Sequence, residues 1–441
     1  MAQAVRIFFI AVLAFNTAAV IFSGPLLASS KKKKPTDEYH LSGSYNLEYG
    51  LHTSAPVNAS NERIGISLQE KARYNSRWSV IASGQAWYEG AYANDTTARP
   101  LWDDSYDVRL QETYVQYEAH KLVLRAGNQV IVWGETFGSF VADVVNPKDL
   151  RFGVPINLGD THLASPMVTG KYLISRFSLQ GLVIAQPMFN LLPVFGYDFA
   201  PANVPLNNYS SVLINRERSL PFGNLEYGAR VSRSFDDFDL SLFDFEYFDR
   251  NPFYQLDHPY IPGQTFTLNE HHSPVNSAGQ ALAWTPKDTD LVVREEIVYT
   301  FARDVTILKP NAILSQLITD ELGAAMSVEL PPWKKFNFSF QYSLSHLQFL
   351  DSYITRSNQD IENVSQRTSV RLPADSTLSS IFTWSILDSG LRWQLDDLTP
   401  ISDQLEGHAG AEIFFGNQLS DFGSISRAGR IYVSIKGYFF Q

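Results

Sequence analysis

Polar side chains at even spacing mark the segment around residue 125. Between residues 121 and 133, Arg125, Gln129 and Trp133 fall on one side of an alternating pattern, and Glu135 continues that side. Successive residues of a β-strand point to opposite faces, so we expect one face of this segment to be polar. A guanidinium, an amide and a carboxylate on one face can form charge-assisted hydrogen bonds and ion pairs.

The preceding strand supplies further polar groups. A turn at Ala119-His120 predicts that Tyr114 lies opposite Arg125, with Glu112 as a diagonal neighbour within reach of a long side chain. A slip of one residue in the register would break this pairing.

Residue types suited to hydrolysis or metal binding are present without the spacing that such sites need. Ser345 and His346 are adjacent, so in a strand they face opposite ways. A later connection gathers histidines and carboxylates, at Asp257, His258, Glu270, His271 and His272. Histidines without tight ligand spacing are usually solvated, so we predict no metal site, no catalytic residue and no cofactor.

The elements that position these residues alternate between apolar and polar positions. In 335–345 every even position is apolar and every odd one is polar, and similar dyads recur from residue 39 to the end. Dyads of roughly 10 residues separated by turns are typical of a transmembrane β-barrel. A soluble sandwich or propeller also alternates. The long strands and the aromatic residues near strand ends favour the barrel.

The composition agrees with this class. The 441 residues are 44% hydrophobic and 18% charged, and aromatic residues reach 13%, which suits girdles at two membrane interfaces. The absence of cysteine excludes disulfides, thiolate metal sites and a lipoprotein anchor. A net charge of −11 argues against nucleic acid as a partner.

The N-terminus resembles a secretory signal. Arg6 precedes an apolar run that begins at Ile7, and small residues at 28–30 suit cleavage. A permanent anchor is the alternative, although about 16 residues is short for a span. The basic run 31–34 resists translocation. We assign 1–30 to a cleaved signal peptide, 31–38 to a basic segment and 39–441 to the barrel.

The pattern predicts an all-β, antiparallel up-and-down transmembrane barrel of about 18 strands, within a range of 14 to 18. The predicted strands are 39–50, 61–73, 76–88, 107–119, 121–133, 165–175, 177–187, 224–234, 237–249, 274–285, 289–303, 319–330, 334–348, 365–372, 376–387, 390–399, 403–415 and 427–440. Short connections, such as 75–76 and 119–120, alternate with long ones. The long connections are 89–106, 134–164, 188–223, 250–273, 304–318 and 349–364. Short periplasmic turns and long outer loops are the pattern of outer-membrane barrels.

The connection 134–164 is long and too apolar for an exposed loop. Its polar residues are Asp143, Asn146, Asp149 and Arg151, and its apolar ones include Phe137, Phe140, Val144, Val145, Leu150 and Phe152. A loop folded into the barrel would bury the apolar residues and bring the polar ones to the lumen, since large barrels otherwise leave an open channel. An outward loop packed on its neighbours is the alternative.

These residues resemble a family of porin-like outer-membrane proteins of Gram-negative bacteria. The shared features are Arg125, Gly127 and Gln129, then Trp133-Gly134-Glu135, followed by Asn146-Pro147-Lys148-Asp149 and Arg151. Glu112 and Tyr114 are similar to a Glu-x-Tyr strand of that family, and 412–416 is also similar. Asn128 stands where the family commonly has a second Arg, so part of its luminal charge cluster is missing. The resemblance implies transport of a hydrophobic or lipidic molecule, in company with an inner-membrane exporter of lipid-like cargo.

Three functions follow as hypotheses. The first is a non-enzymatic outer-membrane channel or transporter whose lumen is constricted by 134–164. The second is an outer-membrane enzyme acting on lipids, and the third is a non-conducting structural or adhesive barrel. The proposed luminal set is Glu112, Tyr114, Arg125, Gln129, Trp133, Glu135, Asp143, Asn146, Asp149 and Arg151. The partners expected of such a barrel are membrane lipids, lipopolysaccharide and the barrel assembly machinery.

Overall fold

The computed structural model describes residues 38–54, 57–91, 105–139, 141–155, 158–193, 198–199, 212–257, 266–309, 313–348, 360–418 and 420–439. The signal peptide 1–30, residues 31–37 of the basic segment, Phe140 and His258 lie outside these residues. Within them, no helix has the length and hydropathy needed to cross a membrane.

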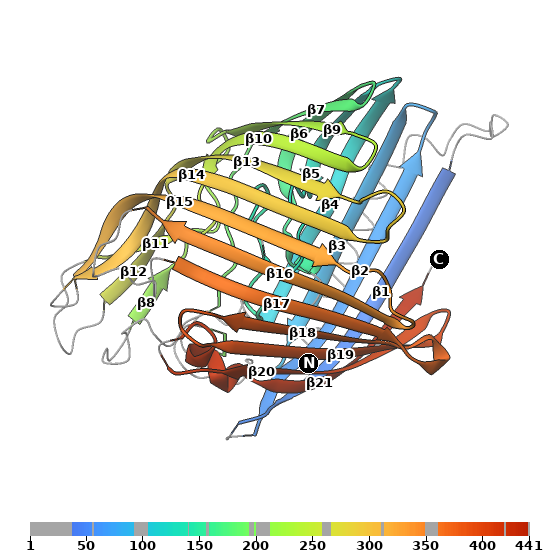
Figure 1. Ribbon diagram of the computed structural model, residues 1–441. Coiled ribbons are helices and arrows are strands. Elements are labelled where there is room, and N and C mark those ends of the chain that lie inside the picture. The colour runs from blue at the N-terminus through green and yellow to red at the C-terminus, as the bar shows by residue number, and fades with distance from the viewer. Residues whose placement is uncertain are drawn as a thin grey trace.

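Eighteen strands form one antiparallel sheet in which each strand pairs with the next, and the last pairs with the first (Figure 1). The strands are β1 (Glu38–His52), β2 (Ala59–Arg73), β3 (Trp78–Glu89), β4 (Tyr106–Ala119), β5 (Leu122–Gln129), β6 (Ser165–Ile174), β7 (Phe177–Ile184), β9 (Glu226–Ser234), β10 (Phe238–Phe248), β13 (Pro274–Trp284), β14 (Val292–Lys309), β15 (Ile313–Glu329), β16 (Phe336–Leu347), β17 (Asp360–Arg371), β18 (Thr377–Ser385), β19 (Leu391–Ser402), β20 (Leu405–Phe415) and β21 (Arg430–Phe439). The prediction of a closed up-and-down barrel of about 18 strands is confirmed.

Alternation along each strand separates the two faces of the wall. Leu47, Ile64 and Val433 lie on the outside and are about half exposed. The residues next to them point inward, as Arg63 shows: its guanidinium lies 4.0 Å from the ring centroid of Phe152, in the connection after β5. Period 2 in the sequence therefore becomes an apolar outer face and a polar inner face.

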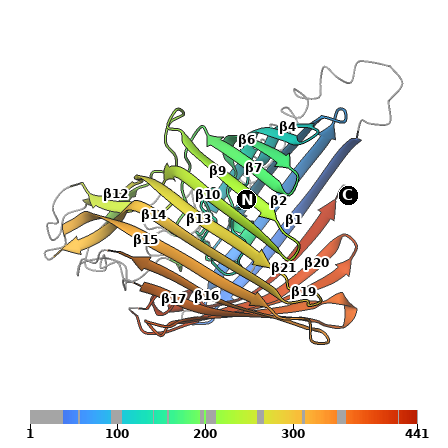
Figure 2. The same ribbon diagram turned by 45° about the horizontal axis from the view of Figure 1, so that its top comes forward.

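Residues 304–309 and 313–318 of the connection predicted at 304–318 are strands and not a loop, which corrects the sequence prediction. β14 and β15 continue as a ladder from Arg303↔Thr319 to Lys309↔Ile313, beyond a register shift near Thr300. Residues 305–308 and 313–318 are rich in Val, Ile and Leu, and such residues suit a pleated strand. The extended hairpin projects beyond the barrel wall (Figure 2).

The loops at this end form a small second sheet. It contains β8 (Val212–Asn215), β11 (Phe253–Leu256) and β12 (Phe266–His271), with β8 and β12 parallel. The Tyr254 amide donates to the Thr306 hydroxyl at 2.8 Å, which ties this sheet to the extended hairpin. The short 3-10 turns are η1 (Leu158–Thr161), η2 (Pro373–Asp375) and η3 (Gly423–Ala428).

Candidate functional site inside the barrel

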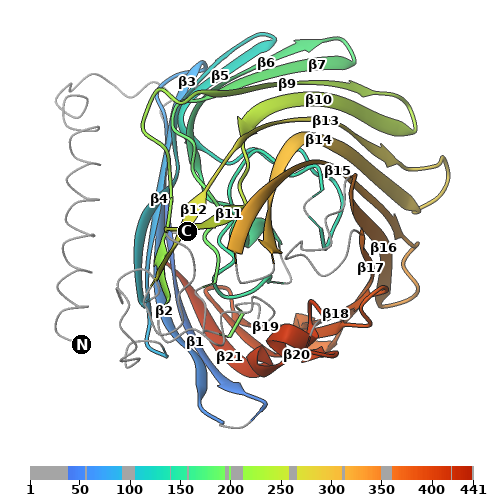
Figure 3. The same ribbon diagram turned by 90° about the vertical axis from the view of Figure 1, so that its left-hand side faces the viewer.

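The connection between β5 and β6 lies inside the ring of strands (Figure 3). β5 ends at Gln129, four residues earlier than the predicted strand 121–133, because the chain leaves the wall there. The side chain of Asn146 holds the backbone where it leaves the wall. Its side-chain oxygen accepts from the Ile131 amide at 2.7 Å, and its amide donates to the carbonyls of Gln129 and Leu163 at 3.0 and 2.8 Å. Asn146 thus satisfies backbone groups that the end of the strand leaves without ladder partners.

Gln129 holds the last position of β5. Its side chain is fully buried, donating to the Met167 carbonyl at 2.9 Å and accepting from the Thr169 hydroxyl at 2.8 Å. Both partners belong to β6, so Gln129 fastens the strand end to its neighbour.

Trp133 anchors the connection to one half of the inner wall. It is fully buried in a cluster with Ala142, Val145 and inward residues of β6, β7, β10, β13 and β14. Its ring centroid lies 5.0 Å from that of Phe243, and its Nε1 donates to Gln180 at 3.2 Å. Burying a large ring with its N–H paired stabilises the inward position of the connection.

Glu296 of β14 fixes the next turn of the connection. Its carboxylate accepts from the backbone amides of Glu135, of Thr136 at 2.6 Å and of Ala142 at 2.8 Å. The Glu296 side chain has no solvent exposure, so these bonds compensate its burial. The Glu135 carboxylate itself lies 3.4 Å from Arg230.

The connection then reaches the opposite walls. Gln341 of β16 donates to the Ser139 hydroxyl at 2.9 Å. Arg392 and Gln394 of β19 donate to the Val154 carbonyl, the latter at 2.9 Å. The connection therefore contacts walls on several sides of the barrel.

Arg151 is the centre of an ion-pair cluster against β4. Its guanidinium contacts Asp149 at 2.7 Å and Asp107 at 2.6 Å, and Arg109 also contacts Asp149 at 2.8 Å. Burial would raise the pKa of Asp149, but the hydrogen bonds and charges of Arg151 and Arg109 hold it well below its ordinary value. The same partners raise the pKa of Arg151. Neither Asp107 nor Arg109 was predicted from the sequence as a site residue.

Asp143 belongs to a separate group. It lies 2.6 Å from His162 Nε2 and 3.6 Å from Lys148 Nζ, and all three side chains are nearly fully buried. Burial would raise the pKa of Asp143, but the Lys148 charge and the His162 hydrogen bond lower it. The acidic residues of the predicted luminal set therefore belong to separate groups: Asp149 contacts Arg151, and Asp143 contacts His162 and Lys148.

Arg125 has a different partner from the one predicted. The turn is His120-Lys121, so the register places Gln116 opposite Arg125 and Tyr114 opposite Gly127. Arg125 Nε donates to Gln116 at 2.7 Å, and its guanidinium carbon lies 5.1 Å from the Tyr114 ring centroid. The residue opposite Arg125 lies two positions from the predicted one. Tyr114 and Arg125 therefore stay on the same face of the sheet and remain in contact.

Glu112 lies at an irregularity between β3 and β4, where the Ser83 hydroxyl donates to the Glu112 carbonyl at 3.0 Å. Among the described residues, no ion pair joins its carboxylate to Arg125. Gly127 has φ 131°, and a Cβ there would lie 2.3 Å from the Thr113 carbonyl oxygen. The glycine between Arg125 and Gln129 is therefore required by the close approach of β4.

Three further buried carboxylates were not predicted from the sequence as site residues. Glu226 accepts two bonds of 2.7 Å from Arg250, whose guanidinium also reaches the Val145 carbonyl. Glu412 accepts from Arg392 and from Gln394. The third is Glu296. Each occupies an inward position of its strand, and this parity is the signal that could have identified them.

The hydrolytic and metal-binding residue types are separated. Ser345 contacts Glu321, whereas the neighbouring His346 contacts Asp360 at 2.5 Å. His272 stacks on Phe189 with a centroid distance of 3.4 Å, and burial lowers its pKa to about 4. Over the described ranges, no three His, Asp or Glu side chains are grouped as metal ligands would be.

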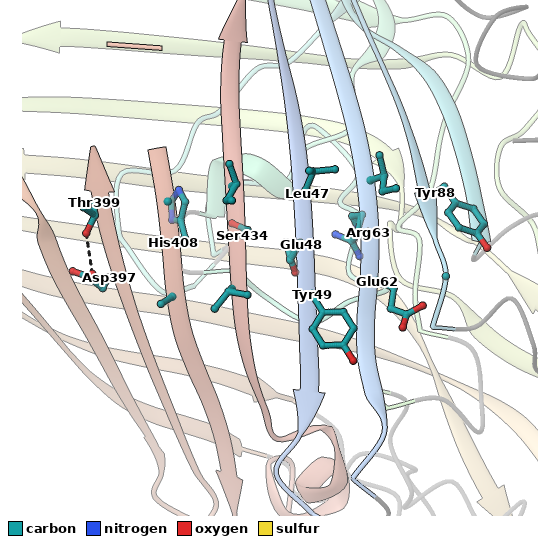
Figure 4. Close-up of a pocket in the computed structure, with 16 residues that line it drawn as sticks. Leu47, Glu48, Tyr49, Glu62, Arg63, Tyr88, Asp397, Thr399, His408 and Ser434 are labelled. Carbon is teal, nitrogen blue, oxygen red and sulfur yellow. Dashed lines mark hydrogen bonds between the residues drawn. The ribbon is translucent and has the colours of Figure 1, made fainter. Parts of the chain in front are cut away.

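Two hollows lie on the wall of the barrel. One, of about 740 Å³, crosses the apolar outer face from β19 to β3, with Leu47, Tyr49 and Glu62 among its residues (Figure 4). The other, of about 350 Å³, lies at the short-turn end of β1–β4 and includes Lys71, Arg73 and Gln116.

The family model described as "Protein of unknown function (DUF1302)" matches residues 31–419. The chain belongs to the DUF1302 family. No curated protein sequence matches it.

Solved structures of outer-membrane proteins share this barrel. OccAB1 of Acinetobacter baumannii has a TM-score of 0.56 at 8% identity, covering 93% of this chain and 99% of its own. OccAB2 of the same organism has a TM-score of 0.53 at 12% identity, covering 91% and 98%. At such low identity the similarity shows the fold alone.

Proposed function

We propose that this protein is an outer-membrane channel or transporter whose lumen is narrowed by the connection 134–164. The supporting observation is the attachment of this segment to inward-facing groups of β6, β14, β16 and β19. Glu296 accepts hydrogen bonds from three backbone amides of this segment. A segment held in this way is suited to define the width of a pathway. The cargo in this proposal is a small or hydrophobic, lipidic molecule.

Export through the cleaved signal peptide 1–30 would deliver the chain to the outer membrane. There it would contact lipopolysaccharide and phospholipids after insertion by the barrel assembly machinery. An inner-membrane exporter of lipid-like cargo is the proposed functional partner, as the family resemblance implies.

The direct test is the deletion of residues 138–148, which removes Ser139, Ala142 and Asn146, three of the residues that attach the segment to the wall. Single-channel conductance in planar bilayers and uptake of a bulky antibiotic by cells should both increase, because the segment no longer occupies the lumen. If both quantities match the wild type in a correctly folded deletion variant, the segment does not define the pathway and the proposal fails.

A milder test uses Glu296→Ala, with Glu295→Ala as the matched control. Glu296 holds the segment, whereas Glu295 has the opposite parity and accepts from Gln280 at 3.1 Å. Charge-assisted bonds contribute roughly 1.5–3 kcal/mol each, so loss of Glu296 should loosen the segment by about 3 kcal/mol or more. We expect noisier, larger currents for Glu296→Ala only. Identical traces for the two variants would contradict the assigned role.

A further inference from the structure

We propose that the inner wall at the short-turn end of β1–β4 binds the anionic group of a transported solute. This inference rests on the proposed function, and it specifies the chemistry of the cargo. The site is the hollow of about 350 Å³ introduced above, which we call the basic vestibule. Its charged and amide residues include His40, Lys71, Arg73, Arg77, Gln116 and Glu118.

The vestibule belongs to the lumen rather than to the outer face. Lys71 and Arg73 have the same parity in β2 as Arg63, whose guanidinium packs on Phe152 inside the barrel. They pair across the sheet with Ile81 and Ser79, and Ser79 pairs with Gln116. A solute that crosses the lumen must pass this end of the wall.

Three cations of the vestibule have no ion-pair partner among the described residues. In the described chain, Lys71, Arg73 and Arg77 form no ion pair, and the Arg73 guanidinium donates only to the Asn75 carbonyl at 3.3 Å. Several inward cations elsewhere are matched by acids: Arg294 by Glu329, Arg392 by Glu412 and Lys436 by Glu406. Three cations that have no ion pair among the described residues therefore lie together at this end of the inner wall.

Arg125 extends this charge deeper into the barrel. It lies in the same cross-strand row as Arg73, Ser79 and Gln116. Its guanidinium bonds to the neutral Gln116 amide and packs over Tyr114, and among the described residues no carboxylate forms an ion pair with it. Two carboxylates, Glu38 and Glu118, line the vestibule as well. With Arg125 the cations outnumber them.

This arrangement fits a carboxylate or a phosphate group. Guanidinium and ammonium N–H groups form strong, directional bonds with such oxygens. The exposed Lys71, Arg73 and Arg77 side chains can turn toward an entering anion, and Arg125 is placed to receive it next. A cationic or purely apolar solute would gain nothing from this wall.

The test measures binding by the purified full-length protein in detergent, by equilibrium dialysis of inorganic phosphate, hexanoate and hexylammonium. The variant is Lys71→Gln combined with Arg73→Gln and Arg77→Gln. Its matched control carries Lys287→Gln, Lys334→Gln and Lys335→Gln, which remove equal charge from turns at the same end. We expect the first variant to weaken anion binding by about tenfold, the effect of roughly one lost charge-assisted bond. The control should bind as the wild type does.

The two probes separate the sources of the anion. Binding of hexanoate alone indicates an amphiphilic carboxylate, and binding of phosphate indicates a phosphoryl group. The inference is overturned if the wild type binds neither anion, if hexylammonium binds equally well, or if both variants bind alike. Lys71→Gln alone, with a smaller expected loss, serves if the triple variant does not fold. If the wild type binds an anion but the 138–148 deletion leaves the conductance unchanged, the proposed function is refuted and the anion site is retained.

Discussion

At the scale of single residues, the inner site depends on a few buried groups that satisfy backbone or charge. Asn146 caps the end of β5, Glu296 gathers three amides, and Arg151 is held between two carboxylates. Removing one partner of such a set leaves the others buried and unpaired, which costs more than the lost bond itself. These residues should therefore be the positions on which the attachment of the connection depends most.

The pair of His162 and Asp143 should make the attachment of the connection depend on pH. Burial would lower the pKa of His162, but the hydrogen bond and charge of Asp143 raise it above 6.5. A group whose pKa is higher in the folded than in the unfolded protein stabilises the fold fully at pH values below its unfolded-state pKa. This stabilisation is lost as the pH rises through its folded-state pKa. Asp143 has a lowered pKa, so its contribution is present above 3.8 and lost as pH falls through the lower folded value.

We therefore expect the connection to be held more firmly at pH 6 than at pH 9. Currents recorded in planar bilayers should be noisier and larger at pH 9. His162→Gln should flatten this dependence, because the glutamine bears no charge at either pH. A wild-type current that is the same at both values would rule out this role for His162. Lys148 also lies close to Asp143, and burial lowers its pKa; it is present in both the wild type and the His162→Gln variant.

At the scale of elements, each strand presents one apolar and one polar face, and the two faces should tolerate charge differently. Phe340 of β16 is 43% exposed on the outside, whereas Ser339 lies on the inner face opposite Glu329. An arginine facing lipid near the middle of a membrane costs roughly 2–4 kcal/mol.

Phe340→Arg should accordingly reduce the yield of assembled barrel in outer-membrane fractions, while Ser339→Arg should assemble nearly as the wild type does. The shift in electrophoretic mobility on heating measures the folded fraction of each. Equal yields for these adjacent substitutions would mean that this face of β16 does not contact lipid.

At the scale of the whole molecule, the connections divide between two ends. Short turns such as 120–121 and 175–176 lie at one end, and the long connections with the β8–β11–β12 sheet lie at the other. This distribution predicts that the long-loop end faces the cell exterior and that the basic vestibule faces the periplasm.

Epitope insertions test this orientation. A tag after Asp257, which follows β11, should be labelled on intact cells, and a tag after Asn75 should be labelled only when the outer membrane is permeabilised. The reverse labelling pattern would invert the assigned orientation and place the vestibule outside.

The sequence by itself determined the barrel. Alternation of apolar and polar residues is a local property of each strand, so all eighteen barrel strands lie close to their predicted positions. Local composition also marked 134–164 as too apolar for an outer loop. The exception is local as well: β14 and β15 include 304–309 and 313–318, which the pattern of long connections had predicted as a loop.

Only the tertiary structure decided the partners inside the barrel. A turn displaced by one residue moves the cross-strand partner of Arg125 from Tyr114 to Gln116. The alternation of apolar and polar residues does not distinguish these two partners. Glu296 meets the Ala142 amide across 154 residues of sequence. Such contacts exist because closure of the sheet brings β5, β14 and β19 around one lumen, and closure is a property of the whole chain.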